Sequence, residues 1–177
     1  MQPAPPIDQR PDTLTEGAAI DRDSRQQFLS LSAALTGFSH AELSATGMAD
    51  VYYDTFASLL GEAMLGCQLI AWAKIAQFQP QVRDQAIAGR MMTDATVGPM
   101  ARNLITLWYL GQWTQMPAEW RGANGAHAND MDQIASADAY VESLVWKAMR
   151  GHPQGAKQPG FGSWALEPAQ GDRHADA

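Results

Sequence analysis

The chain has 177 residues, 46% of them hydrophobic, which is enough for one domain built around a single core. Twelve lysines and arginines against nineteen aspartates and glutamates give a formal charge of −7, which disfavours binding to nucleic acid or to an anionic membrane surface. The single cysteine, Cys67, excludes an internal disulfide framework, and no apolar run reaches the length of about 20 residues that a membrane span requires.

The N-terminal part of the chain is polar at first and then acquires helical periodicity. Residues 1–27 contain five acidic residues, three arginines and four prolines, without the apolar core of a secretion signal. We therefore predict a disordered leader over residues 1–23. Asp23 then precedes an amphipathic pattern that ends at Gly37, which predicts the first helix from Ser24 to Thr36.

The middle of the chain has helical spacing almost throughout. The predicted segments are a long helical region from Ser39 to Ala71, then Gln81–Asp94 and Pro99–Gly111. Glycines interrupt the long region, and we expect a kink or a split near Gly61. The side chains expected to fill the core as ordinary apolar groups are Cys67, Trp72, Met91, Met92, Met100 and Trp108.

The last part of the chain is less regular. Residues 113–129 are rich in Pro, Gly, Ala and Asn and have no period, which predicts a long loop. Ser136 or Asp138 should cap a fifth helix that runs to about Met149. Its expected inward side is Tyr140, Val141, Leu144, Val145 and Met149. No segment alternates as a strand would, so the fold class predicted is all-α, a small helical bundle of about five helices over residues 24–150, followed by an irregular Pro/Gly/aromatic tail over residues 151–177.

Motifs for known chemistry are missing from the sequence. No glycine-rich dinucleotide turn, phosphate-binding loop or haem attachment motif occurs, and we expect no cofactor or metal in this chain. The four histidines are His40, His127, His152 and His174, and none of them has another His or Cys at the spacing of metal ligands. One alternative stays open, a stand-alone helical enzyme that uses His127, Asp130 and Asp132 from the 113–132 loop. Helix capping is the simpler interpretation of the two aspartates.

Three tryptophans are hard to assign to a core from sequence. Trp113 and Trp120 fall in the predicted loop, and Trp164 falls in the tail. Because tryptophan is enriched at the energetic centres of protein interfaces, we predict that these three contact a partner. The tail segment Pro159–Pro168 combines proline, glycine and aromatic residues, so it favours an extended, partner-bound conformation over a regular element.

Four segments together resemble the small (gamma) subunit of membrane-associated FAD-dependent sugar and alcohol dehydrogenase complexes, the sorbitol, fructose and glucose dehydrogenase small-subunit family. The segments are Phe28-Leu-Ser-Leu-Ser-Ala-Ala-Leu-Thr-Gly37, Leu107-Trp-Tyr-Leu-Gly111, Tyr140-Val-Glu-Ser-Leu-Val-Trp146 and Pro159-Gly-Phe-Gly-Ser-Trp-Ala-Leu-Glu-Pro168. They extend over about 140 residues of the chain and have the order and approximate spacing of that family.

The resemblance implies a non-catalytic accessory subunit. Such a chain would bind and help to mature, and in many cases export, an FAD-dependent large subunit of the glucose-methanol-choline type. A multihaem cytochrome subunit with haem c commonly completes these complexes. The matched positions, which the resemblance places in the core or at the partner interface, are Trp108, Tyr109, Tyr140, Trp146, Pro159, Gly160, Phe161 and Trp164.

Two departures from the family pattern bear on location. Members of the family typically begin with a twin-arginine export signal, whereas the first predicted helix here follows a polar leader with no such signal. The resemblance implies the periplasmic face of the inner membrane, reached through the complex, with the cytoplasm as the alternative. Some relatives also have a cysteine just before the segment that begins at Pro159, whereas residues 155–158 here contain none, so we expect no covalent tether at that point. A gluconate-2-dehydrogenase-type small subunit is the alternative within the same class, and it differs mainly in the substrate of the complex.

Overall fold

A computed structural model of the chain describes residues 13–125, 127–153 and 156. Within these residues the α-helices are α1 Thr13–Thr36, α2 His40–Ala45, α3 Ala49–Leu60, α4 Glu62–Ala76, α5 Pro80–Ala86, α6 Val97–Leu110, α7 Ala118–Asn124 and α8 Leu144–Ala148. A short π-helix, Ile87–Met91, follows α5 directly. The two strands, β1 Gln112–Trp113 and β2 Gln133–Ile134, pair antiparallel with Gln112 opposite Ile134. The predicted all-α class is confirmed, with more helices in the described residues than the five expected.

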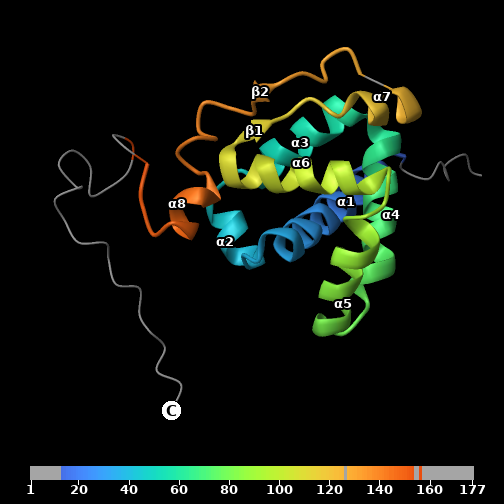
Figure 1. The fold of residues 1–177 in the computed structure, drawn as a ribbon. Coiled ribbons are helices and arrows are strands. Elements are labelled where there is room, and N and C mark those ends of the chain that lie inside the picture. The colour runs from blue at the N-terminus through green and yellow to red at the C-terminus, as the bar shows by residue number, and fades with distance from the viewer. Residues whose placement is uncertain (1–12, 126, 154–155, 157–177) are drawn as a thin grey trace, which may run out of the picture.

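Helix α6 lies at the centre of the fold, where it packs against α1, α3, α4 and α8 (Figure 1). The buried side of these helices is formed by aromatic and long aliphatic side chains that meet edge to face. Phe28 of α1 contacts Tyr53 and Phe56 of α3, and Tyr52 contacts Trp108 of α6 at a ring-centroid distance of 4.8 Å. Edge-to-face pairs of this kind stabilise a core by about 0.5–1.5 kcal/mol each beyond the area that they bury.

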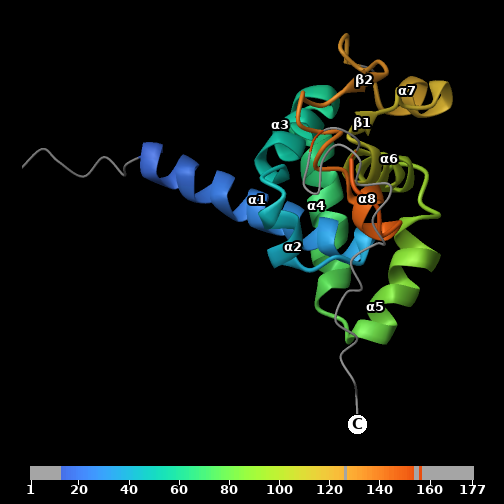
Figure 2. The same cartoon turned by 90° about the vertical axis from the view of Figure 1, so that its left-hand side faces the viewer.

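The N-terminal half of α1 differs from the prediction. The helix begins at Thr13, so residues 13–23 of the predicted leader are helical, and residues 1–12 lie outside the described part. Arg25 supplies a physical reason, because its guanidinium bonds Asp21 one turn earlier at 2.9 Å and Asp54 of α3 at 2.7 Å. It also lies 4.3 Å from the ring centroid of Tyr53. Figure 2 shows the start of α1 extending away from the other helices.

The long helical region splits at Gly61, as expected. The direction of the chain changes by 118° between helices α3 and α4. Gly61 has φ +81 and ψ 158, a conformation open to glycine and unfavourable for other residues. Among the described residues no single helix is long and apolar enough to cross a membrane, although this bent pair reaches the required length and composition together.

Two predictions for the last third of the chain were wrong. The predicted 113–129 loop contains β1 and α7, and the predicted fifth helix is reduced to α8 because the residues before it form turns. Ala139 lies in those turns, fully buried against Gly111. Leu144 is buried as expected, whereas Met149 is 72% exposed.

Only some of the side chains expected in the core are buried. Trp72, Met91, Met100 and Trp108 are buried. Cys67 is exposed on α4, so the prediction of a buried thiol was wrong. The buried stripe of α4 is formed instead by Leu65, Gln68, Leu69, Trp72 and Ile75.

Candidate partner-binding surface

Three of the tryptophans assigned to partner binding lie inside the protein. Trp108 has no exposed surface, Trp113 is 1% exposed and Trp120 is 5% exposed. The indole N–H of Trp120 donates to the carbonyl of Thr96 at 2.7 Å, which ties α7 to the start of α6. Side chains buried to this degree cannot reach a partner in this conformation. Their position makes them part of the core that supports the surface.

The segment that carries Trp113 is held by a buried carboxylate. Asp130 is 4% exposed, and its Oδ1 accepts the indole N–H of Trp113 at 2.8 Å. The same carboxylate accepts the backbone N–H of Met116 at 3.2 Å. One indole N–H and one backbone N–H thus donate to the same carboxylate, and hydrogen bonds to a charged acceptor are stronger than those between neutral groups. Sequence periodicity alone gave no sign of this contact, because the residues involved are separated by more than a dozen positions along an irregular segment.

The residues of the alternative enzyme hypothesis share this structural environment. Oδ1 of Asp132 accepts the backbone N–H of Gln115 at 2.7 Å, and the carbonyl of His127 accepts the backbone N–H of Asp130 at 3.0 Å. The imidazole of His127 packs against Gly61, at the bend between α3 and α4. Both carboxylates therefore already act as acceptors that fasten the segment between α6 and α8.

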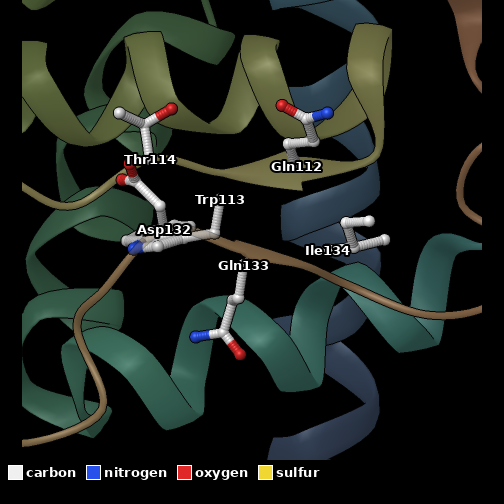
Figure 3. A pocket seen from close by; sticks show the side chains of 6 residues that line it. All are labelled: Gln112, Trp113, Thr114, Asp132, Gln133 and Ile134. Carbon is white, nitrogen blue, oxygen red and sulfur yellow. The ribbon is translucent and has the colours of Figure 1, made fainter.

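A small pocket lies along the β1–β2 ribbon. It has a volume of about 290 Å³ and is lined by six side chains of the two strands and their neighbours, Gln112, Trp113, Thr114, Asp132, Gln133 and Ile134. Figure 3 shows Gln112 and Ile134 at one end and Thr114 and Asp132 at the other. This volume is at the lower limit of ligand pockets in proteins, so the pocket offers little room for a nucleotide cofactor.

Tyr109 joins two helices. Its hydroxyl donates to the carbonyl of Thr36 at the end of α1, at 2.9 Å, and its ring contacts Phe38 edge to face. The side chain is partly buried. The hydroxyl of Tyr109, one of the predicted partner-binding residues, therefore links α6 to the end of α1 within the fold.

Tyr140 and Trp146 form the most accessible aromatic pair among the predicted site residues that the structure describes. Tyr140 is 48% exposed, and Trp146 is partly exposed. Their rings meet edge to face at 5.2 Å, and the indole N–H of Trp146 donates to the carbonyl of Tyr140 at 2.7 Å. The turn that carries Tyr140 is thereby fixed to α8, and both rings stand at the surface.

Further exposed apolar side chains lie on neighbouring segments. Leu110 is 49% exposed and Ile134 is 65% exposed. The carbonyl of Gly111 accepts the backbone N–H of Ala135 at 3.0 Å, which places the end of α6 beside β2. We call the set Leu110, Ile134, Tyr140, Trp146 and Met149 the end patch, because these residues come from the segments that meet at the C-terminal end of α6, whose ribbons Figure 1 shows side by side. Sequence reasoning missed Leu110 and Ile134, and it placed Met149 in the core.

Gly111 explains how these segments approach so closely. It ends α6 with φ +69 and ψ 16, in the left-handed region. A Cβ atom built on Gly111 would lie 2.6 Å from both the Cβ and the carbonyl oxygen of Ala139. The turn before Tyr140 can therefore pack on the end of α6 only because residue 111 has no side chain.

The described part of the chain contains no cluster of metal-ligating side chains. No group of three or more His, Cys, Asp or Glu residues within it could hold a metal ion. Burial and the negative charge of Glu142 raise the pKa of Tyr52, so this phenol stays neutral. The predicted site residues Pro159, Gly160, Phe161 and Trp164 lie outside the described residues. Comparison of the chain with protein-family models, curated proteins and solved structures found no match.

Proposed function

We propose that this chain is a non-catalytic accessory subunit that binds the FAD-containing large subunit of a sugar or alcohol dehydrogenase complex. The observation that carries the proposal is the end patch. Large apolar side chains that are exposed or partly exposed come from the segments that meet at the end of α6, namely α6 itself, β2, the Tyr140 turn and α8. Two of them, Tyr140 and Trp146, are the first and last residues of one of the four segments that resemble the family.

The chemistry of the patch suits a protein partner better than a small molecule. Aromatic side chains with few rotatable bonds supply contact area at low entropic cost, and they are enriched in the centres of interfaces. The pair of Tyr140 and Trp146 is already held in place by a hydrogen bond and a ring contact. A surface ordered before binding loses less side-chain freedom when the partner arrives.

The proposal includes the wider role that the resemblance implies. The chain would help the large subunit of the glucose-methanol-choline type to fold and load FAD, and it would accompany that subunit to the periplasmic face of the inner membrane. A multihaem cytochrome subunit would complete the complex. The substrate would be bound in the large subunit, and a gluconate-2-dehydrogenase-type complex would use this chain in the same way.

Co-expression tests the role. The flavoprotein encoded next to this chain should be recovered with less bound FAD, measured by its flavin absorbance, when this chain is omitted. Recovery of the same amount of flavin-loaded protein without this chain would refute the maturation role.

Single substitutions test the surface. Ile134→Glu places a charge in the end patch at a side chain that is 65% exposed, so the fold should tolerate it. Val82→Glu is the matched control, because Val82 is 52% exposed on α5, away from the patch. We expect Ile134→Glu to reduce co-purification with the flavoprotein at least about tenfold and Val82→Glu to leave it unchanged, since a buried unpaired charge costs several kcal/mol. Equal effects of the two substitutions would place the interface elsewhere.

A further inference from the structure

Arg150 has an unusual backbone conformation for a residue with a side chain. It directly follows Met149, the C-cap of α8, and its φ of 54 lies in the left-handed region. All other residues with a positive φ in the described part of the chain are glycines. Because a Cβ atom makes this region unfavourable, the backbone at position 150 would suit glycine better than arginine.

The end of α8 requires this conformation. The backbone N–H of Gly151 donates to the carbonyl of Trp146 at 2.8 Å, and that of Arg150 donates to the carbonyl of Lys147 at 3.1 Å. These two bonds form the turn that commonly ends a helix, in which the left-handed residue is most often glycine. The turn brings the chain back to the indole, because a Cβ built on Gly151 would lie 3.9 Å from the ring of Trp146. An arginine therefore stands beside Trp146 where the turn favours glycine.

The side chain of Arg150 makes no contact in the described fold that would offset this cost. It is exposed, and its guanidinium forms no hydrogen bond, ion pair or ring contact with another described residue. Lys147, one turn earlier, differs because its charge already acts on an acid of the same chain. Hydrogen bonds from Ser39 and, to a smaller extent, the charge of Lys147 hold the pKa of Glu42 below its ordinary value. A strained residue whose side chain the fold does not use indicates a role outside the fold.

The neighbours of Arg150 belong to the end patch. Met149, which is 72% exposed, precedes it, and Trp146 lies across the turn. Arginine and large apolar side chains are together enriched in protein interfaces, whereas lysine is depleted there. The guanidinium is planar and can direct two parallel N–H groups at one carboxylate, so an acidic side chain is the group that it recognises best.

We propose that Arg150 determines which protein the end patch accepts, by donating two hydrogen bonds to a carboxylate on the surface of the flavoprotein. Apolar contacts around the pair exclude water and strengthen it. A protein without an acid at that point would leave the guanidinium partly buried and unpaired, which disfavours binding. This inference rests on the proposed function, and it adds the charge that the partner surface has to carry.

Arg150→Gly separates the side chain from the backbone. The isolated variant should unfold at a higher urea concentration than the wild type, because relief of the left-handed conformation exceeds the added freedom of glycine in the unfolded chain. Its Kd for the flavoprotein should nevertheless rise at least about fivefold. Arg90→Ala is the control for removal of a positive charge, because Arg90 is exposed on the π-helix after α5, and it should leave the Kd unchanged.

Arg150→Lys tests the paired hydrogen bonds. Lysine keeps the charge but not the planar pair of donors, so it should recover only part of the lost affinity. The Kd of the wild type should also rise more steeply than that of Arg150→Gly between about 50 mM and about 500 mM NaCl. With the wild type bound, equal affinity of Arg150→Gly, or full recovery by Arg150→Lys, would overturn the contact alone. Lower stability of Arg150→Gly would also overturn it, since the side chain would then serve α8 itself. A wild type that does not bind the flavoprotein would refute the proposed function and this contact together.

Discussion

Gly111→Ala is the substitution that most directly tests how the end patch is built. Two effects should add. Alanine at a left-handed backbone position costs about 1–2 kcal/mol, and φ at Gly111 is +69. The new methyl group would also lie 2.6 Å from the carbonyl oxygen of Ala139, so backbone has to move, and overpacking of this kind costs about 1–3 kcal/mol. We expect a total loss of about 2–5 kcal/mol.

Gly47→Ala separates the two effects. Gly47 has φ +70, nearly the same as Gly111, but a Cβ built on it meets nothing within 4 Å. It should therefore lose only the conformational part, about 1–2 kcal/mol. The smaller conformational entropy of alanine in the unfolded chain applies equally to both variants, so it cancels when they are compared.

Equilibrium urea unfolding followed by far-UV circular dichroism measures both losses. The reasoning requires Gly111→Ala to be less stable than Gly47→Ala by about 1–3 kcal/mol, which is the cost of the contact with Ala139. If the two variants lose the same stability, the close approach of the Tyr140 turn to the end of α6 does not exist in solution.

Two other substitutions test contacts that support the site. Asp130→Ala removes the buried acceptor of the Trp113 indole and should lower the free energy of unfolding by about 2–3 kcal/mol in the same urea assay, whereas a catalytic aspartate would leave stability unchanged. Hydrogen bonds from Ser39 hold the pKa of Glu42 below its ordinary value of 4.5, so its contribution to stability is present at neutral pH and is lost as pH falls through the lowered pKa. The stability difference between the wild type and Glu42→Gln, measured by thermal unfolding, should therefore shrink below pH 4.5, and a difference that stays constant into acid would contradict this capping role.

Local signals predicted the parts of the fold that local interactions determine. The capping box at Ser39 and Glu42, the bend at Gly61 and the helix that contains Pro99 are all present, because each depends on residues within one or two turns. Arg25 shows the limit of this reasoning. Its hydrogen bonds to Asp50 and Asp54 of α3 stabilise the first part of α1. That part has no apolar stripe in the sequence, so hydrophobic periodicity does not predict it as a helix.

The candidate site was less predictable, because long-range contacts decide which aromatic side chains are buried. Trp113 and Trp120 lie in segments without periodicity, and only the bonds to Asp130 and to the Thr96 carbonyl bring them into the core. Tyr140 was expected on a helix, but the fit of Ala139 against Gly111 favours a turn that exposes it. Composition indicated an aromatic surface in this part of the chain without indicating which aromatic residues form it.

The buried tryptophans still contribute to the proposed surface, through the backbone that they hold. Trp113 fixes β1 through Asp130, and β1 positions Ile134 through the register of the ribbon. The end of α6 positions Tyr140 through Gly111. Ile134 and Tyr140 of the end patch thus rest on buried contacts, so a partner meets them on a backbone that is already ordered. Loss of one of these buried contacts should consequently weaken partner binding even though the partner never touches the substituted residue.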